Sequence, residues 1–179
     1  WDEGRGELDD FRAAVSYIGE KVFFKYVYEK GVAYRSWFYM IDRTGQGSAQ
    51  NEMGATPANF AMASGGVLED VSRTVREGIS TSELNSTVER MLSQYFLNAQ
   101  DDASLARRLC YYEMVGLGYE FADRYPEMLR KVGTAEVNAA ARKYLDPSRY
   151  TRVAVGNEAA VKAAGAAVLP PAGARDPKR

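Results

Sequence analysis

The sequence predicts an α+β fold in which an antiparallel or mixed sheet is backed by several helices. Apolar residues recur at three- and four-residue spacing through most of the 179 residues, as is typical of helices with one buried face. Strand-like runs stand at residues 32–41, 49–56 and 150–155. Because these runs do not alternate with the helices, a parallel doubly wound sheet is ruled out.

The first predicted helix leads into a predicted hairpin. Gly31 ends a helical pattern over residues 8–30, whose apolar stripe consists of Leu8, Phe11, Val15, Ile18 and Val22. The run VAYRSWFYMI at 32–41 is too rich in β-branched and aromatic residues for a surface helix. A turn cluster at 42–48 follows, and residues 49–56 then provide a candidate return strand.

The next segment predicts a helix over residues 56–78. Thr56 is placed to cap it, Pro57 to occupy its first turn and Gly78 to end it. The pair Gly65-Gly66 weakens the middle of this helix, so we expect a kink or a close packing contact there.

The remaining elements are also mainly helical. Ser80 and Glu83 have the spacing of a capping box that starts a helix, and further helices are expected at 103–115, before Lys131, and from Thr134 to Leu145. Pro147 closes the last of these, whose buried stripe is Val137, Ala140, Ala141, Tyr144 and Leu145. After a short strand at 150–155, we expect one domain to end at residue 157, with a short helix and a loosely ordered tail over 158–179.

The composition excludes several kinds of active site. The chain contains no histidine, which rules out Ser-His-Asp and Cys-His machinery and a His-ligated zinc site. Cys110 is the single cysteine, and its apolar flanks at helical spacing predict a buried structural thiol. The formal net charge of −1 provides no basic field for nucleic acid, and no run is long and apolar enough for a membrane span.

Other polar clusters have structural interpretations. The acid pairs Asp9-Asp10 and Asp101-Asp102 lie near expected helix starts, where carboxylates favour the helix dipole, so we prefer that role to metal ligation. The residues alone therefore predict a soluble α+β domain without a complete active site. Any catalytic function must be completed by another domain or chain.

Three motifs add a family resemblance that covers residues 8–157. They are YEKGVAY, EGISTSELNSTVERML and VGTAEVNAAARKYLDPSRYTRVAVG, in this order and at suitable separations. Together they resemble the C-terminal, non-catalytic domain of the pitrilysin/insulinase-type zinc metallopeptidases. This inverzincin superfamily includes bacterial processing-peptidase-like proteins and the mitochondrial processing peptidase. There, a helix ends in a pattern close to R-E-x-x-G-L-A-Y before a strand.

The resemblance implies a role without a zinc site in this chain. In the family, zinc is held by an H-x-x-E-H helix and a distal Glu, both in an N-terminal homologous domain. We therefore expect no cofactor in this chain and expect zinc in that missing domain or in a partner subunit. The C-terminal domain forms half of a closed chamber and contacts the peptide substrate. The family thus implies a homo- or hetero-dimer or a longer chain, and a soluble protein of the bacterial cytoplasm or periplasm. The net charge of −1 predicts no contact with nucleic acid.

The family's substrate-holding residues are an Arg and a Tyr. The Tyr matches Tyr34, although a tyrosine in an aromatic strand taken alone is more often a packing residue. Val27 stands where the family has Arg, and a neutral side chain cannot form its cationic clamp. Either the pair is degraded, or Lys25, Lys30 or Arg35 takes its place. Tyr34 and Arg35 are therefore the candidate substrate-binding residues.

Two other hypotheses remain open from the sequence. The first is that the chain belongs to a non-catalytic structural or assembly subunit of the same superfamily with no proteolytic role. A third possibility is an unrelated α+β interaction module, which a structure without a helix-backed sheet would support. The family domain also begins with a strand before its first helix, so we expect a fragment that lacks this strand and has an incomplete sheet edge.

Overall fold

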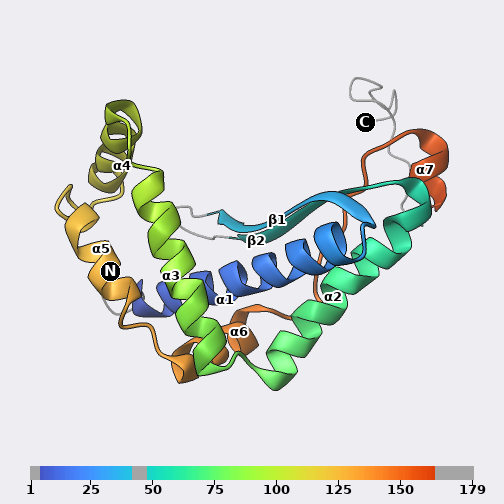
Figure 1. Cartoon of the computed structure of the whole chain (residues 1–179), viewed down its shortest axis with the longest axis horizontal. Coiled ribbons are helices and arrows are strands. Elements are labelled where there is room, and N and C mark those ends of the chain that lie inside the picture. The colour runs from blue at the N-terminus through green and yellow to red at the C-terminus, as the bar shows by residue number, and fades with distance from the viewer. Residues whose placement is uncertain (1–4, 42–47, 164–179) are drawn as a thin grey trace, which may run out of the picture.

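The computed structural model describes residues 5–41 and 48–163 and has helices around a short sheet (Figure 1). The chain order is α1 (Arg5–Phe23), a π-helical turn η1 (Phe24–Glu29), β1 (Ala33–Ile41), β2 (Ser48–Ala55), a 3-10 turn η2 (Pro57–Asn59), α2 (Phe60–Glu77), α3 (Thr81–Leu97), α4 (Asp102–Met114), α5 (Phe121–Leu129), α6 (Thr134–Tyr144) and α7 (Glu158–Ala163). The predicted α+β class is confirmed. Most of the predicted turn cluster and the predicted tail after Ala163 lie outside the described residues.

The sheet of the described part is an antiparallel hairpin of β1 and β2. One face of the hairpin packs on α1, which crosses beneath it (Figure 1). The approach is close, because a Cβ added at Gly19 would lie 3.1 Å from the Cβ of Phe38. Gly19 therefore lets α1 pack directly against the hairpin. The hypothesis of an unrelated α+β interaction module, which a sheet without backing helices would have supported, loses its support.

The hydrophobic core centres on α1. Ile18 and Val22 are fully buried, as is Val137 on α6, and α1 also packs against α2 and α3. α1 continues into the π-helical turn η1, where the Lys30 N–H donates to the Lys25 carbonyl, five residues back, at 3.0 Å. Gly31 follows with a φ of +59°. The predicted helix and its glycine stop are thus present, with a π-helical last turn.

The Gly65-Gly66 pair is a packing feature. α2 runs through it as one continuous helix, and a Cβ at Gly66 would overlap the hydroxyl and ring of Tyr26, whose side chain is 1% exposed. Gly65 faces open space. The close-packing interpretation is therefore correct for Gly66.

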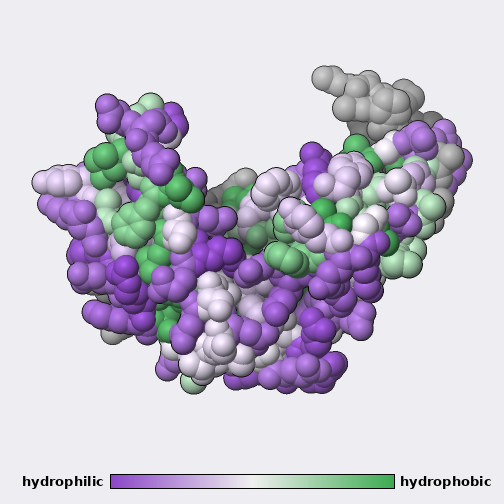
Figure 2. Space-filling view, viewed as in Figure 1, coloured by the Kyte–Doolittle hydropathy of each residue, from purple (hydrophilic) through white to green (hydrophobic). Residues whose placement is uncertain are grey.

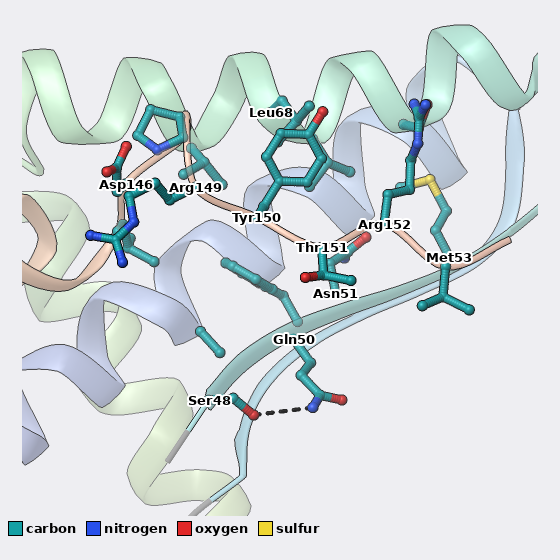
Figure 3. Close-up of a pocket in the computed structure, with 18 of the residues that line it drawn as sticks. Ser48, Gln50, Asn51, Met53, Leu68, Asp146, Arg149, Tyr150, Thr151 and Arg152 are labelled. Carbon is teal, nitrogen blue, oxygen red and sulfur yellow. Dashed lines mark hydrogen bonds between the residues drawn. The ribbon is translucent and has the colours of Figure 1, made fainter. Parts of the chain in front are cut away.

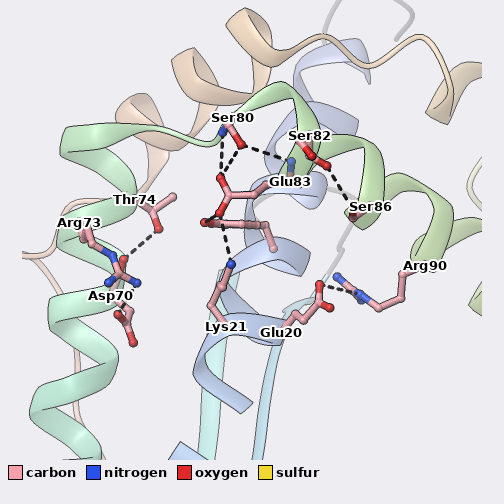
Figure 4. Close-up of polar contacts among 11 residues, drawn as sticks. Glu20, Lys21, Asp70, Arg73, Thr74, Ser80, Ser82, Glu83, Ser86 and Arg90 are labelled. Carbon is pink, nitrogen blue, oxygen red and sulfur yellow. Dashed lines mark hydrogen bonds and ion pairs between the residues drawn. The ribbon is translucent and has the colours of Figure 1, made fainter. Parts of the chain in front are cut away.

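A polar joint links α1, α2 and α3 (Figure 4). Ser80 and Glu83 form the predicted capping box, and Glu83 also accepts a 2.8 Å hydrogen bond from the Tyr17 hydroxyl and pairs with Lys21 at 3.2 Å. Burial alone would raise the pKa of Glu83, but the hydrogen bonds from Ser80, Tyr17 and Lys21 outweigh it and lower the pKa to about 2. Glu83 is therefore held as a carboxylate where the three helices meet.

A second ionic cluster fixes α2 to the end of α1. The Asp70 side chain is 2% exposed, and its Oδ1 lies 2.8 Å from both Lys25 Nζ and Arg73 Nη2. Removing one partner of such a buried cluster leaves an uncompensated charge. Lys25 and Arg73 are therefore needed where they are to neutralise Asp70.

Several predictions about the C-terminal half are wrong. Residues 150–155 join no sheet, since within the described residues β1 and β2 pair only with each other. Cys110 is exposed, because α4 packs mainly against α5 and buries none of its residues. Tyr144 is 46% exposed although the rest of its predicted stripe is buried.

One predicted helix start is confirmed and another differs. α6 begins at Thr134, as predicted, with Gly133 as its N-cap. Thr56 precedes the 3-10 turn η2 and makes no capping hydrogen bond through its side chain.

Every helix within residues 5–41 and 48–163 is too short or too polar to cross a lipid bilayer.

Candidate functional site on the open face of the hairpin

The hairpin has one covered face and one open face. Ser36, Phe38 and Met40 alternate toward the helices, while Trp37 and Tyr39 are exposed on the other face. This alternation follows from the two-residue period of a strand. The open face thus presents large aromatic side chains to solvent, an arrangement that is typical of recognition surfaces.

Tyr34 lies at a β-bulge next to this face. Ala33 pairs with Ala55 and Arg35 pairs with Gly54, so Tyr34 is the extra residue on β1. Such a bulge redirects a side chain and is common beside active sites. The ring of Tyr34 lies across Gly54, and its side chain is 70% exposed. The structure therefore displays this tyrosine instead of packing it in the core.

Val27 stands where the family has Arg, and Lys25, Lys30 and Arg35 are the candidates to replace that Arg. The three candidates differ in how free their side chains are to reach a substrate. Lys25 is held by buried Asp70, and burial alone would lower its pKa, but Asp70 and Tyr26 outweigh this and raise it. Lys30 Nζ lies 5.3 Å from the centre of the Tyr26 ring, and Val27 packs half-buried against the core. Arg35 is the candidate next to Tyr34 on the hairpin.

Arg35 makes an exposed ion pair with Glu52 on β2. Its Nη2 lies 2.7 Å from Glu52 Oε1, and both side chains are about half exposed. A surface pair of this kind contributes only about 0–1 kcal/mol, so the guanidinium can be redirected at little cost. Tyr34 and Arg35 together offer a hydroxyl and a cation at one end of the open face.

The described residues do not form a metal centre. No three His, Cys, Asp or Glu side chains gather within residues 5–41 and 48–163 in a way that could hold an ion. Asp101 caps α4 by accepting from the Ser104 N–H at 2.9 Å, as expected for a helix start. The side chains present therefore do not fit a catalytic zinc, which takes three protein ligands.

The surroundings of the hairpin are concave. Figure 2 shows a hollow between the α3–α4 side of the molecule and the α2–α7 side, and in Figure 1 the hairpin lies between these sides. Apolar residues gather over α3 and α4 in this view, and the exposed ones include Phe96, Leu97 and Met114. A partner or substrate that covered the hollow would bury this apolar surface.

Sequence reasoning named Tyr34 and Arg35 but missed their supports. The alternation in YRSWFYM could have placed Trp37 and Tyr39 on one face. The bulge and the role of Gly54 depend on the register between the strands, which a single strand's sequence does not encode.

Comparison with known proteins gives a likeness of fold. No family model and no curated protein sequence matches the chain. One similar structure is a protein of Bordetella pertussis Tohama I that is provisionally named a zinc protease. Its TM-score is 0.61 at 14% sequence identity, and the match covers 80% of this chain and 81% of that chain. Another is the periplasmic protease PqqL from Escherichia coli, with a TM-score of 0.58 and 19% identity over 79% of this chain.

The chain spans only 16% of the length of PqqL. At these identities the likeness concerns the fold and not the activity. The resemblance stated from the motifs is thus confirmed at the level of the fold: the chain has the α+β fold of a domain found in zinc-protease structures.

Proposed function

We propose that this chain is the zinc-free, peptide-contacting domain of a pitrilysin/insulinase-type zinc peptidase. In this proposal it forms one half of a chamber, and a homologous zinc-binding domain of the same polypeptide or of a partner subunit forms the other half. The observation that carries the proposal is the display of Tyr34 at a bulge, over Gly54, beside an open aromatic face. The ring covers Gly54 and still leaves the tyrosine 70% exposed, so a peptide on this face could reach its hydroxyl.

The open face suits an extended peptide. The aromatic rings of Trp37 and Tyr39 offer apolar contacts, the hydroxyl of Tyr34 can donate to a peptide carbonyl, and Arg35 can bind a carboxylate. This chain would therefore bind and orient the peptide, while bond cleavage would need the other domain.

Binding by this chain is the first test. We expect a fluorescein-labelled unstructured peptide to bind, and Tyr34→Ala to weaken this binding. Tyr111→Ala is the matched control, because Tyr111 is an exposed tyrosine on α4, at the opposite end of the molecule from the start of β1 (Figure 1). Equal affinity of the wild type and Tyr34→Ala would contradict the proposed contact.

Turnover by the complete assembly is the second test. In a chelator-sensitive assembly, Tyr34→Phe should lower turnover about tenfold, which is the value of one hydrogen bond made in the transition state. A lower melting temperature with unchanged turnover would make Tyr34 a packing residue. Chelator-insensitive inactivity in every combination of partners would remove the peptidase function.

A non-catalytic assembly subunit is the second candidate function. It is favoured by Val27, which stands half-buried where the family has Arg, and by the engagement of Lys25 and Lys30 elsewhere. Arg35→Gln tests whether Arg35 has replaced the missing Arg. It should weaken peptide binding if it has, and unchanged binding would mean that the pair is degraded; chelator-sensitive turnover of the complete assembly separates the two functions.

A further inference from the structure

The open face of the hairpin carries both of the charged side chains that β1 and β2 contain. These are Arg35 and Glu52, which form an ion pair at 2.7 Å. Glu52 lies directly opposite Trp37 in the register of the two strands, and both side chains are exposed. The Cβ atoms of directly opposed residues lie about 4.5–5.5 Å apart. A carboxylate and an indole ring therefore stand next to each other on this face.

Side chains of β2 alternate between the two faces of the sheet. Gln50, which shares the face of Glu52, points away from α2 and from the segment 149–152, and its amide donates to the Ser48 hydroxyl at 3.0 Å (Figure 3). A strand that paired with the free edge of β2 would lie in the plane of the sheet and would leave this face open. The arrangement of Trp37 and Glu52 therefore does not depend on what borders that edge.

The ring of Trp37 suits a cation. Trp37 is 60% exposed, and tryptophan is the aromatic side chain that attracts cations most strongly. Within the described residues, the lysines and arginines that lie over an aromatic ring do so over tyrosine or phenylalanine and not over Trp37. The described part of the chain thus leaves the face of this indole to a cation that a bound peptide brings.

Glu52 has an oxygen that can bind the same cation. Its Oε1 accepts from Arg35 Nη2, which leaves Oε2 for a second donor. One carboxylate of this molecule already binds two cations, since Asp70 Oδ1 lies 2.8 Å from both Lys25 Nζ and Arg73 Nη2. A peptide cation at Glu52 would repeat that arrangement at the surface.

We infer that the open face binds a lysine or arginine side chain of the peptide between the Trp37 ring and the Glu52 carboxylate. This inference rests on the proposed function and adds a substrate class to it, namely extended peptides that contain a basic residue. Arg35 retains its other guanidinium N–H groups for a carboxylate of the same peptide. Glu52 is then a residue that determines specificity and takes no part in bond cleavage.

Two matched peptides test this inference by calorimetric titration of the full chain. The first is acetyl-Ser-Phe-Ser-Lys-Ser-Phe-Ser-amide, and the second has norleucine, a neutral side chain of nearly the same shape, in place of lysine. We expect the lysine peptide to bind about fivefold to tenfold more tightly at low salt, because it adds one exposed ion pair and one exposed cation–π contact. Added salt should reduce this preference, since it screens exposed charges. Equal affinities overturn the inference.

Three variants locate the lysine. Glu52→Gln should make the two peptides bind equally, and it should leave the affinity of the norleucine peptide unchanged. Glu127→Gln is the matched control, because it removes the same charge from an exposed position on α5. Arg35→Gln should strengthen the preference, because Glu52 then has no other cation to bind. The inference is overturned by a lysine preference that survives Glu52→Gln or that Arg35→Gln lowers.

The part played by the ring needs its own variant. Trp37→Leu keeps an apolar side chain but removes the aromatic face, so the ratio of the two affinities should fall about twofold to fivefold. Because both peptides lose the same apolar contact, the ratio reports the cation alone. An unchanged ratio overturns the placement of the cation on Trp37, and with it the inference.

Failure of this inference can be told apart from failure of the proposed function. If the two peptides bind equally and Tyr34→Ala weakens both, the peptide-contacting face stands and only the preference for a basic residue is lost. If neither peptide binds more tightly than about 1 mM, the proposed peptide contact fails as well.

Discussion

The ring of Tyr34 lies across the backbone of Gly54 on the neighbouring strand, at the bulge that interrupts the register of the hairpin. A Cβ added to Gly54 would lie 2.7 Å from the Tyr34 hydroxyl oxygen and closer still to two ring carbons. No core side chain encloses this ring, because it is 70% exposed. The glycine therefore determines the orientation of an aromatic residue that contributes little to the core.

Gly54→Ala should change the orientation of Tyr34 with little change in stability. The exposed ring can swing away from the new methyl group, so we expect the free energy of unfolding to change by no more than about 0.5 kcal/mol. The ring resonances of Tyr34 should shift, and peptide binding should fall as it does in Tyr34→Ala. Unchanged resonances would show that the ring is not held over Gly54 in solution.

Gly66→Ala, unlike Gly54→Ala, should clearly lower the free energy of unfolding. Its methyl group meets Tyr26, which is 1% exposed and cannot move aside, so overpacking should lower the free energy of unfolding by about 1–3 kcal/mol. Gly65→Ala is the matched control in the same helix. It meets nothing within 4 Å and should stabilise the protein by about 0.5–1 kcal/mol, as expected when alanine replaces glycine in a helix interior. Equal effects of the two substitutions in urea denaturation would contradict the packing at Gly66.

The elements that could be predicted from the sequence are those specified by local signals. The capping box of Ser80 and Glu83, the stop at Gly31 and the aromatic strand β1 are each encoded within a few residues, and all are present. Residues 150–155 have the composition of a strand, but a strand forms only beside a partner edge, and sequence composition does not supply that edge. Cys110 was misassigned for a similar reason, because helical periodicity marks an apolar side without showing what covers it.

The candidate site was predictable only in part. Tyr34 follows from its place after the Gly31 stop in a family-like motif, and Arg35 from its adjacency. Their supports, Gly54 and Glu52, come from the opposite strand and depend on register. The unavailability of Lys25 depends on Asp70, which is 45 residues away in sequence. Such relations arise from tertiary packing and leave no local pattern.

Glu83→Gln should destabilise the joint of the three helices at neutral pH. The variant loses a charge that Ser80, Tyr17 and Lys21 stabilise, so we expect a loss of about 1 kcal/mol in the free energy of unfolding. Glu89→Gln is the control, because Glu89 is exposed on the same helix.

The pH dependence of this difference follows from the pKa of Glu83. The folded-state pKa of about 2 lies below the ordinary value of 4.5, so the carboxylate stabilises the fold above about pH 4.5 and this contribution is lost as the pH falls toward 2. The difference between wild type and Glu83→Gln should therefore shrink across that range in denaturant titrations. A constant difference would mean that the charge is not involved.

Asp10→Asn should stabilise the protein at neutral pH. Burial, together with the neighbouring carboxylates of Glu136, Asp9 and Glu7, raises the pKa of Asp10 to about 6. Because the folded-state pKa exceeds the ordinary value of 3.8, the folded state binds the proton more tightly, and stability falls as the pH rises from about 4 to 6. Asparagine removes this penalty, which we place at about 1 kcal/mol because solvent screens a partly exposed charge.

The advantage of Asp10→Asn should therefore be largest above pH 7 and absent near pH 4. Added salt should reduce the part that comes from the neighbouring carboxylates and leave the part that comes from burial. Thermal unfolding of both proteins at pH 4 and pH 8, each at low and high salt, measures the two parts separately. An advantage that is the same at both pH values would show that a packing change, and not the removal of a buried charge, causes the stabilisation.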